Sequence, residues 1–506
     1  MDVSVTLTSF GQVTGADLVT IIRSMKIKSN KLDILPHWLM KDTFQVLMPL
    51  YVCFVNCVLK NGLPLEYKHA VITPLLKNAS LEKEDLKNYR PVSNFPTLVK
   101  IIEKTVANKL LQHLDRNRLM DPYQSAYRNH YSCETAVLSV LNDIYMAMDQ
   151  KEISIAALLD MSAAFDTVDH GLLITKLEER GIKDDALNWL RMYLCDRAYS
   201  TQIREHKSNP LPLKMSVPQG SVLGPLLFTI YIRQLGEVID ETGVRYNIYA
   251  DDTQLLVHTN PSQLSSVFLR ISHCINEILN WTSHNFLQLN SSKTEFIIFG
   301  TREQLRRIDV NELTVNNQSF PIQMVVRNLG ILLDSQLKFS KHVDNICRAA
   351  YGNLRMLQRV RSSLSNDQFS VLAHALVLSR IEYAPSVLYG VDKCELKKLQ
   401  RVIKAAFRYT FRYRRRDKIS EVMRERGWLS IDQRITLRLL LILHTAIKTG
   451  KPDYLSKLVT LSSSQFGLRS QTRGDLHSHR SITKIGSRSL MIAAPKVWGC
   501  QKVGYS

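Results

Sequence analysis

The sequence has none of the cysteine patterns that mark metal-binding or disulfide-rich modules. Its eight cysteines form no Cys-x-x-Cys pair, which excludes a zinc knuckle and the disulfide framework of a small secreted domain. The chain also lacks the charged, apolar and cleavage regions of a secretory signal peptide at its start. These absences predict a reducing, intracellular setting rather than secretion.

Long apolar runs and repeats are missing as well. The most apolar window, residues 44–59, contains Gln45, Pro49 and Asn56 and is shorter than the roughly 20 residues that a membrane-spanning helix needs. We therefore expect a buried helix there and no membrane partner. Because no internal repeat or low-complexity tract is present, domain boundaries have to be found from changes in pattern. Apolar spacing predicts one helix over residues 98–114 and another beyond residue 340, through Val343, Ile346, Ala350, Leu354 and Leu357.

What the sequence has instead is length, apolar content and an uneven charge. With 506 residues, of which 45% are hydrophobic, the chain is long enough for several domains with a sizeable core. Its formal net charge of +20 lies entirely in residues 341–506, which hold 31 Lys and Arg against 11 Asp and Glu, while residues 1–340 hold 35 of each. A basic region attached to a charge-balanced body predicts a polyanionic partner that is bound through its phosphates.

Two adjacent carboxylates interrupt an alternating pattern at "YADD", residues 249–252. Apolar residues recur on both sides with the two-residue period of strands, at Val244, Tyr246, Ile248, Leu255 and Val257. One interpretation is a hairpin turn, where Asp is common. The other is a metal site, because adjacent carboxylates without a basic neighbour repel each other and gain from a bound cation. A metal site would need a third acidic group from elsewhere in the chain.

Asp160 is the candidate for that third acid. Residues 153–159 form an apolar run that predicts a central strand, covered on both faces and ending at Asp160. A carboxylate at the end of a buried strand costs several kcal/mol unless a cation compensates its charge. With Asp251 and Asp252 it could hold two Mg²⁺ ions about 4 Å apart, which suits in-line displacement at phosphorus. Asp166 and Asp169 are instead predicted to cap a helix that stops at Gly181.

A loop rich in glycine and proline, "SVPQGSVLGPLLFTIYI", lies between these acids. Pro218, Gly220, Gly224 and Pro225 predict a tight connection that leads into a helix. A plain strand-to-helix connection explains these four residues. It does not explain Gln219, whose side chain both donates and accepts hydrogen bonds beside residues that allow close backbone approach, and which could touch a base pair.

The order of these motifs resembles one family, the reverse transcriptases of non-long-terminal-repeat (LINE-type) retrotransposons. The resemblance runs from about residue 60 to 345 in the family's order and spacing. The matching text is "NYRPVSNFPTLVKIIEK", "QSAYRNHYSCETAV", "LLDMSAAFDTVDH", "SVPQGSVLGPLLF", "YADDTQLL", "LNSSKTEFIIFG" and "VRNLGILLDSQLKFSKHV". "YADD" alone would say little, whereas seven blocks in register are specific.

The resemblance implies a right-hand polymerase, an α+β fold with helical fingers and thumb around a palm whose sheet is antiparallel. The expected divisions are a helical N-terminal extension over 1–75, fingers over 76–150, a palm with interleaved fingers elements over 151–335, and a basic helical thumb and C-terminal region over 336–506. The implied activity is DNA synthesis on an RNA template, in which the 3′-hydroxyl of a DNA primer attacks the α-phosphate of a deoxynucleoside triphosphate. The implied cofactors are two Mg²⁺ ions, for which Mn²⁺ could substitute.

The resemblance also implies roles for the residues that match the family's motifs. The metal-binding, catalytic carboxylates would be Asp160, Asp251 and Asp252. Tyr249 and Ala250 would line the hairpin near the primer end, and Phe165 would be the aromatic gate that excludes a ribose 2′-hydroxyl. The incoming nucleotide and template would meet Gln219 and Gly220, while Arg90 and Lys77 would neutralise the triphosphate.

Three further assignments follow from the same resemblance, each beside a simpler interpretation. Lys293 falls where such polymerases carry a candidate proton donor to pyrophosphate, although a lysine there can equally be solvated. Leu329 and Gly330 match the block that grips the primer, and a tight turn between strands is compatible with that. The segment "FRYTFRYRRRDK" interleaves rings with arginines, namely Arg408, Arg412, Arg414, Arg415 and Arg416. It fits a nucleic-acid surface, the end of an amphipathic helix or a nuclear import signal.

Two features of the family are missing. Full-length members carry an endonuclease upstream, for which this chain has no room, and metal-binding cysteines and histidines are absent. We therefore expect a truncated copy, which the resemblance would place in the nucleus. The alternative is a catalytically inactive remnant that still binds RNA or DNA through its basic region. A phosphatase built on "LLDMS" explains less, since it leaves "YADD" and "VPQG" unused.

Overall fold

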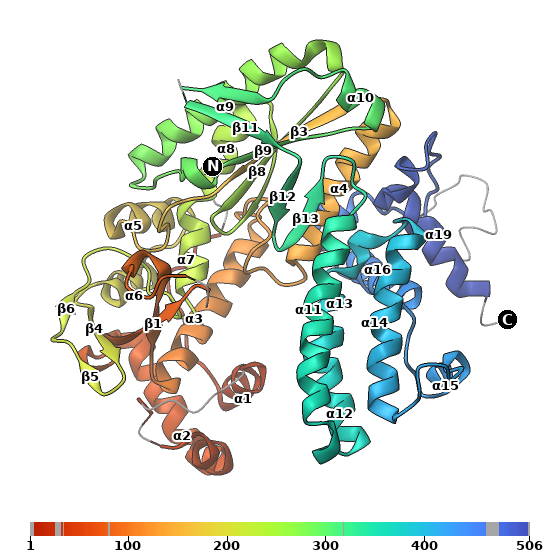
Figure 1. Cartoon of the computed structure of the whole chain (residues 1–506). Coiled ribbons are helices and arrows are strands. Elements are labelled where there is room, and N and C mark those ends of the chain that lie inside the picture. Colours follow the sequence, from red (N-terminus) through yellow and green to blue (C-terminus); the bar gives the residue numbers. More distant parts are fainter. Residues whose placement is uncertain are drawn as a thin grey trace, which may run out of the picture. The chain divides into compact units, whose positions relative to one another are not determined.

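A computed structural model describes residues 5–25, 32–33, 35–78, 81–316, 318–461 and 475–503 of an α+β protein (Figure 1). The chain forms two compact units. Unit 1 comprises residues 1–127, 161–238 and 277–290, and unit 2 comprises residues 128–160, 239–276 and 291–506. Because each unit is assembled from separate stretches, no single cut in the sequence divides them. The linear boundaries expected for fingers, palm and thumb remain a prediction.

Unit 2 is built on a six-stranded sheet whose strand order is β10-β11-β9-β3-β8-β7. The bounds are β3 Ile153–Leu159, β7 Arg245–Tyr249, β8 Asp252–Thr259, β9 Glu295–Phe299, β10 Glu312–Val315 and β11 Gln318–Gln323. As predicted, β3 is central and almost entirely buried, because it pairs with β8 on one side and with β9 on the other. One expectation is wrong: β11 runs parallel to β9, so the sheet is not antiparallel throughout.

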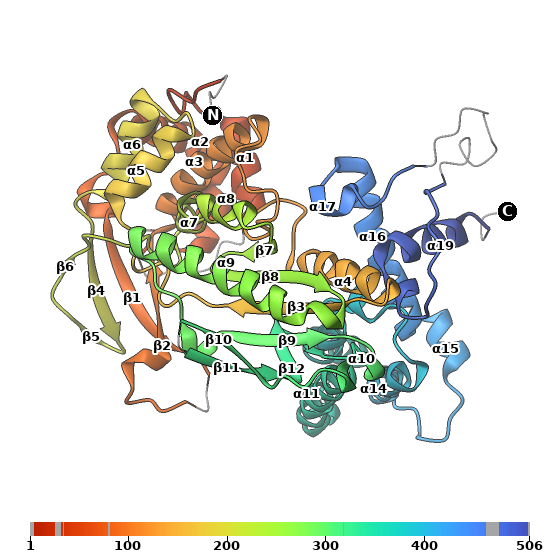
Figure 2. The same ribbon diagram turned by 90° about the horizontal axis from the view of Figure 1, so that it is seen from above.

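Helices cover this sheet and continue into the basic part of the chain. Helix α4 (Cys133–Asp149) packs along β3 and β8, as Figure 2 shows from above. Helices α11 (Ser340–Arg359), α14 (Lys393–Phe411) and α16 (Ile431–Thr449) follow. The buried face of α11 includes the spacing predicted from the sequence, Val343, Ile346, Ala350, Leu354 and Leu357. Burying such side chains contributes about 1.5–3 kcal/mol for each Leu or Ile, so this stripe fixes how α11 packs.

Unit 1 contains a smaller sheet and the helices around it. The strand order is β2-β1-β4-β5, and β6 also pairs with β4. The bounds are β1 His69–Leu76, β2 Tyr89–Asn94, β4 Ala198–Ile203, β5 His206–Lys207 and β6 Leu211–Pro212. The expected helix over residues 98–114 is α3 (Thr97–Arg116). The helical reading of residues 1–75 fails at its end, where Pro74 lies within β1, beyond the four residues that pair with β4. Proline is tolerated at such an edge position.

Helix α2 (His37–Asn61) also differs from the prediction of a buried helix. Tyr51, Val55 and Val58 are buried, but Val46 is 80% exposed and Leu50 is 66% exposed. Within the described residues, one helical segment, Asp42–Asn61 of α2, is long enough and apolar enough to cross a membrane by length and composition. Of its most apolar window, 17% is buried. A single helix of this kind is a weak indication, because core helices of soluble proteins pass the same test. The apolar residues of α2 lie on all sides of the helix, so the sequence could not show which face is buried.

Candidate active site

The register of the unit 2 sheet aligns the first acid with the other two. In the β3–β8 pair, Leu159 lies opposite Thr253. Continuing this antiparallel register by one residue sets Asp160 opposite Asp252. Asp160 follows the last residue of β3, where its side chain is 23% exposed. Two residues that are 92 positions apart in sequence therefore reach the same end of neighbouring strands.

The "YADD" segment is a two-residue hairpin turn between β7 and β8, as predicted. Tyr249 pairs with Asp252, so Ala250 and Asp251 form the turn. Ala250 has a left-handed φ of 56° and is only 5% exposed. A buried non-glycine residue in this conformation is uncommon, and such positions cluster at functional sites. The turn chemistry and a carboxylate site are thus both served by the same four residues.

The electrostatics of these acids have a clear sign. Burial is the main cause that raises the pKa of Asp252 to about 6; the negative charges of Asp251 and Asp160 also raise it, and Lys293 lowers it. Asp251 and Asp160 therefore lie within electrostatic reach of Asp252 and disfavour its ionised form. The Lys293 Nζ atom lies 2.8 Å from Asp160 Oδ2, so the lysine is an ion-pair partner and not merely solvated.

A divalent cation fits this site by charge, although the side chains do not yet form a closed cage. Over the described ranges, no three His, Cys, Asp or Glu side chains converge closely enough to be a preformed metal site. The charges of Asp251 and Asp160 nevertheless act unfavourably on ionised Asp252, and Lys293 supplies compensating positive charge at Asp160. Hard oxygen ligands are what Mg²⁺ prefers. The donor set of Asp160, Asp251 and Asp252 therefore fits the cation by charge and ligand type.

The "VPQG" loop belongs to unit 1, where many contacts hold its backbone. Ser93 donates its N–H to the Gln219 carbonyl at 2.7 Å. Gly220 has a φ of 105°, and a Cβ atom there would meet the Ser93 carbonyl oxygen at 2.5 Å. Val222 donates its N–H to Glu103 Oε2 at 2.6 Å. Glycine is required at position 220 for two reasons, the conformation and the close approach.

Below this loop, the helix predicted from glycine and proline spacing is α7 (Gly224–Tyr231), with Pro225 in its first turn. The half-buried Phe165 ring stacks on Phe228 of α7, with centroids 4.4 Å apart. Its carbonyl accepts the Val217 N–H at 3.1 Å. Phe165 and the "VPQG" loop are therefore neighbours within unit 1, which is compatible with the gate assignment.

The two cations assigned to the triphosphate also lie in unit 1. Arg90 is exposed on β2, opposite Leu75 of β1. Lys77 directly follows β1 and donates from Nζ to the Lys87 carbonyl at 2.7 Å. Burial raises the pKa of Asp166, and the charge of Lys77 partly offsets this rise.

Leu329 and Gly330 form the turn of a hairpin between β12 (Val325–Asn328) and β13 (Ile331–Asp334). Both residues have positive φ values, 45° for Leu329 and 85° for Gly330. The Tyr383 hydroxyl donates to the Leu329 carbonyl at 2.7 Å. This confirms the predicted tight turn, and it shows a tyrosine support that the sequence did not indicate.

The ring-and-arginine segment near residue 411 is mostly occupied with its own packing. Phe407 is fully buried, and it contacts the rings of Phe411, Tyr413 and Trp428. The Phe407 ring is therefore not available for base stacking, whereas Tyr409 is 41% exposed. The stacking role expected for this segment remains a prediction for its other rings. A local alternation could not reveal that Trp428 contacts Phe407 and Phe411.

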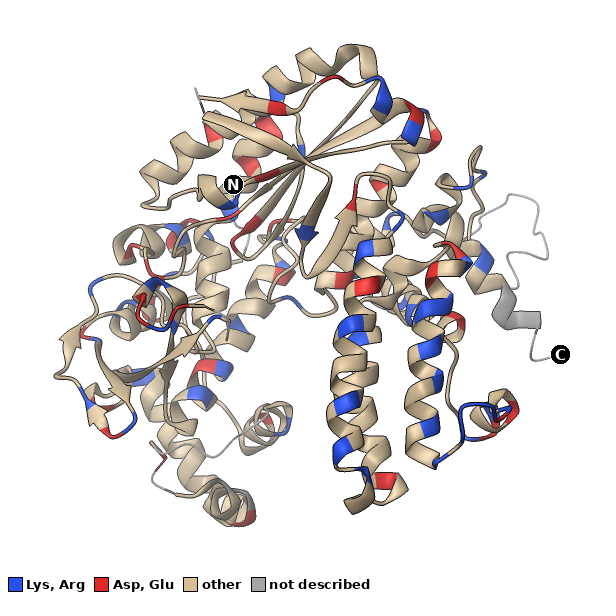
Figure 3. Ribbon diagram, viewed as in Figure 1, with Lys and Arg blue, Asp and Glu red and all other residues tan. Residues whose placement is uncertain are grey.

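The arginines of this segment differ among themselves. Arg408 donates to the carbonyl oxygens of Arg414 and Asp417, and Arg412 ends α14 with a left-handed φ of 60°. Arg412 and Arg414 are exposed. Figure 3 shows that Lys and Arg also recur along α11 and α14. The basic region therefore retains surface charge even where Arg408 is tied to the backbone.

Sequence reasoning missed the role of Asp166 beside Gln219 of the "VPQG" loop. Asp169 caps α5 (His170–Glu179), as predicted, because its Oδ1 accepts the Leu172 N–H at 2.8 Å. Asp166 does not cap, which corrects the prediction. Its Oδ1 instead accepts a hydrogen bond from Gln219 Nε2 at 3.0 Å. The two residues are 53 positions apart, and no periodic signal links them.

Comparison with known proteins identifies the chain's relatives. The RNA-directed DNA polymerase from mobile element jockey of Drosophila melanogaster is 28% identical over 346 residues, which cover 67% of this chain and 36% of that protein. The probable RNA-directed DNA polymerase from transposon BS of the same species is 28% identical over 354 residues, 68% of this chain and 38% of that protein. A Pol polyprotein from the type-1 retrotransposable element R1 of Bradysia coprophila is 23% identical over 348 residues, 67% of this chain and 33% of that protein.

The chain thus spans little more than a third of the length of these relatives. Their names confirm the predicted resemblance to retrotransposon polymerases. The family model described as "Reverse transcriptase (RNA-dependent DNA polymerase)" matches residues 81–333, which include the three acids and the "VPQG" loop. Since this segment is half of the 506 residues, the chain belongs to the reverse transcriptase family.

Proposed function

We propose that this protein is an RNA-directed DNA polymerase of a retrotransposon, which adds deoxynucleotides to the 3′-hydroxyl of a DNA primer on an RNA template. The observation that carries the proposal is the register of β3 and β8. It aligns Asp160 with Asp252 beside Asp251, in a chain of the reverse transcriptase family. Clustered carboxylates that repel one another gain from divalent cations, which polymerase chemistry uses.

Asp160, Asp251 and Asp252 would hold Mg²⁺, with two ions proposed and Mn²⁺ as a substitute. When bound, such ions activate the attacking hydroxyl and stabilise the charge that develops at the phosphate. Lys293 would then leave its ion pair with Asp160 and become free to face the leaving pyrophosphate. The position of Lys293 supports this role. Its side chain is 62% exposed, and the residue lies four positions before Ile297 of β9.

The remaining assignments complete the proposed right-hand arrangement of palm, fingers and thumb. The palm would be the six-stranded sheet of unit 2. The fingers residues Lys77, Arg90, Gln219 and Gly220 would meet the triphosphate and template, and Phe165 would favour deoxyribose. Leu329 and Gly330 would contact the primer, and the helices after residue 336 would hold the nucleic acid through their charge. Work on chromosomal DNA in the nucleus would follow from this function.

Primer extension tests the proposal directly. Purified protein, a primed RNA template, deoxynucleotides and Mg²⁺ should give extended primer, and Asp251→Asn should not. Extension that is absent with both Mg²⁺ and Mn²⁺ would contradict the proposal.

The charge of the C-terminal region and the ion pair between Lys293 and Asp160 favour a second candidate function. The chain would then be an inactive nucleic-acid-binding protein. In that case RNA or DNA binds, with an affinity that falls steeply with salt, while nucleotide incorporation equals that of Asp251→Asn.

A further inference from the structure

Asp166 is a half-buried carboxylate whose position helix capping does not explain. It lies between two groups to which a nucleotide role is assigned. Its Oδ1 atom accepts a hydrogen bond from Gln219 Nε2 at 3.0 Å, and the charge of Lys77 acts on it from the end of β1. All three residues belong to unit 1. The carboxylate therefore touches one proposed substrate group directly and attracts a second.

The contact determines which end of the Gln219 amide is presented. A glutamine amide offers an acceptor oxygen at one end and a donor nitrogen at the other, and free rotation would exchange them. An ionised carboxylate can only accept hydrogen bonds. The hydrogen bond to Asp166 consequently points Nε2 of Gln219 towards the carboxylate. Oε1 of Gln219 then points away from Asp166 and can accept a hydrogen bond from another molecule.

The backbone on both sides of this contact is fixed. The Gln219 carbonyl accepts the Ser93 N–H at 2.7 Å, and the segment of Asp166 is joined to the loop where Val217 donates to the Phe165 carbonyl at 3.1 Å. With the main chain held, the side-chain bond is what remains to determine the direction of the Gln219 amide. Preorganised groups of this kind lower the cost of binding a substrate.

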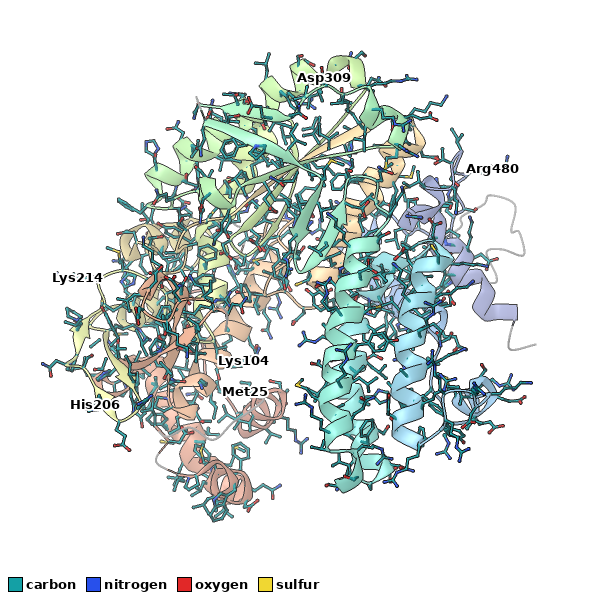
Figure 4. All side chains as sticks on the ribbon, in the orientation of Figure 1. Met25, Lys104, His206, Lys214, Asp309 and Arg480 are labelled. Atoms are coloured by element: carbon teal, nitrogen blue, oxygen red, sulfur yellow. The ribbon has the colours of Figure 1, made fainter. Side chains whose placement is uncertain are left out.

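Space for a ligand lies beside the two side chains. A cavity of about 450 Å³ is lined by Asp166, Gln219, Ser93, Tyr199 and Lys214, among others. Lys214, labelled in Figure 4, follows β6 on the rim of this unit. The lining contains polar groups and one cation at its edge, which suits a part of a nucleotide or nucleic-acid strand.

We propose that Asp166 is a positioning residue that sets the orientation of the Gln219 amide for the incoming deoxynucleotide. This inference rests on the proposed function. Removing the carboxylate leaves Gln219 free to rotate, so nucleotide binding weakens while the acids that carry the chemistry are unchanged.

Steady-state primer extension with four variants tests this inference. Asp166→Ala should raise the KM for the incoming nucleotide about tenfold, as expected for the loss of one charge-assisted hydrogen bond, with a smaller change in kcat. Asp166→Asn offers donors as well as an acceptor, so it no longer selects one orientation of the Gln219 amide, and its KM should lie between that of the original protein and that of Asp166→Ala. In a Gln219→Ala background, Asp166→Ala should add less than about twofold, because the two residues act through one contact.

The matched control is Asp169→Ala, three residues away. It removes a helix cap, so it should lower the Tm and leave the KM unchanged. A KM that Asp166→Ala and Asp169→Ala alter equally would overturn the inference, since a general loss of stability would then explain both.

A second measurement does not depend on activity. In protein labelled with ¹⁵N-glutamine, the side-chain amide signal of Gln219, assigned by its loss in Gln219→Ala, should shift on Asp166→Ala but not on Asp169→Ala. An unshifted signal overturns the inference even if the protein extends no primer. Lack of extension with a shifted signal would instead contradict only the proposed function.

Discussion

Two acidic settings, one in each unit, show how neighbours give the same residue type different roles. In unit 2, burial and, to a smaller extent, the carboxylate neighbours Asp251 and Asp160 raise the pKa of Asp252 to about 6. In unit 1, burial also raises the pKa of Asp166, but its neighbours Gln219 and Lys77 both lower it. A raised pKa alone therefore does not indicate a cation site. The sign of the neighbours' effect separates a cluster that gains from a metal from a carboxylate that is already satisfied.

The largest effect should come from breaking the unit 2 cluster. Asp251→Asn removes one negative charge from the proposed metal site, and we expect primer extension to fall by at least about 10³-fold. Asp169→Asn in unit 1 is the control, because Asn caps a helix about as well as Asp does, and it should retain activity. Comparable losses in both variants would erase the distinction between the two settings. Radiolabelled primer extension measures this.

The loop of unit 1 should depend on backbone geometry and not on repulsion between charges. Gly220→Ala forces a Cβ atom to 2.5 Å from the Ser93 carbonyl oxygen at a φ of 105°. We expect it to destabilise the protein by about 1–3 kcal/mol through strain at that φ, with more from the clash, and to reduce extension.

Gly243→Ala is the matched control for the glycine change. Gly243 has a φ of 67°, but nothing lies within 4 Å of an added Cβ atom. Its cost should be limited to about 1–2 kcal/mol of left-handed strain. Urea unfolding compares the two variants, and an equal loss of stability would show that the close approach to Ser93 is unimportant.

The third prediction concerns pH and the metal-free protein. The pKa of Asp252 in the folded state, about 6, lies above the ordinary value of 3.8. Folded protein thus binds more protons than unfolded protein between these values, so the group's contribution to stability falls as pH rises from about 4 to 6. Above pH 6, Asp252→Asn should have a higher Tm than the original protein, because the substitution removes a buried charge and its repulsion by Asp251 and Asp160.

That difference in Tm should shrink as the pH falls from 6 to 4, because folded Asp252 becomes protonated over this range while the unfolded carboxyl stays largely ionised above pH 4. Differential scanning calorimetry with chelator, at pH 5 and pH 7.5, measures it. A constant difference would mean that folding does not raise the pKa of Asp252.

The smallest effect should come from Lys293, a cation that pairs with Asp160 and lowers the pKa of Asp252. Exposed ion pairs contribute about 0–1 kcal/mol, and Lys293 is largely exposed. Lys293→Gln should therefore lower the Tm slightly in chelator, and Lys293→Arg should not. Adding Mg²⁺ should reduce the difference between these variants, since the ion takes over compensation of the carboxylates. A difference that Mg²⁺ leaves unchanged would indicate that lysine and metal act at separate places.

Periodicity predicted the elements that carry the acids. The apolar run before Asp160 indicated a covered central strand, and the alternation around "YADD" indicated a hairpin. Both are confirmed, because side chains that alternate across a strand record which face is buried. The spacing on α11 was equally informative.

Patterns that are local or ambiguous predicted less. The rings between residues 407 and 413 alternate with arginines, yet Phe407 is buried against Phe411, Tyr413 and Trp428. The apolar helix α2 gave no sign of which face would remain exposed. For Phe407, the covering residue Trp428 lies outside the pattern.

The sequence by itself determined the strands, the turn that carries Asp251 and Asp252, the acid at the end of β3 and the family to which the chain belongs. Only the tertiary structure decided that Asp166 accepts a hydrogen bond from Gln219 instead of capping a helix. The same holds for the ion pair of Lys293 with Asp160 and for the hydrogen bond from Tyr383 to the turn at Leu329. Local backbone geometry repeats along the chain, so the spacing of apolar residues indicates it. A hydrogen bond between residues separated by 53, 133 or 54 positions depends on how the elements pack, which no spacing records.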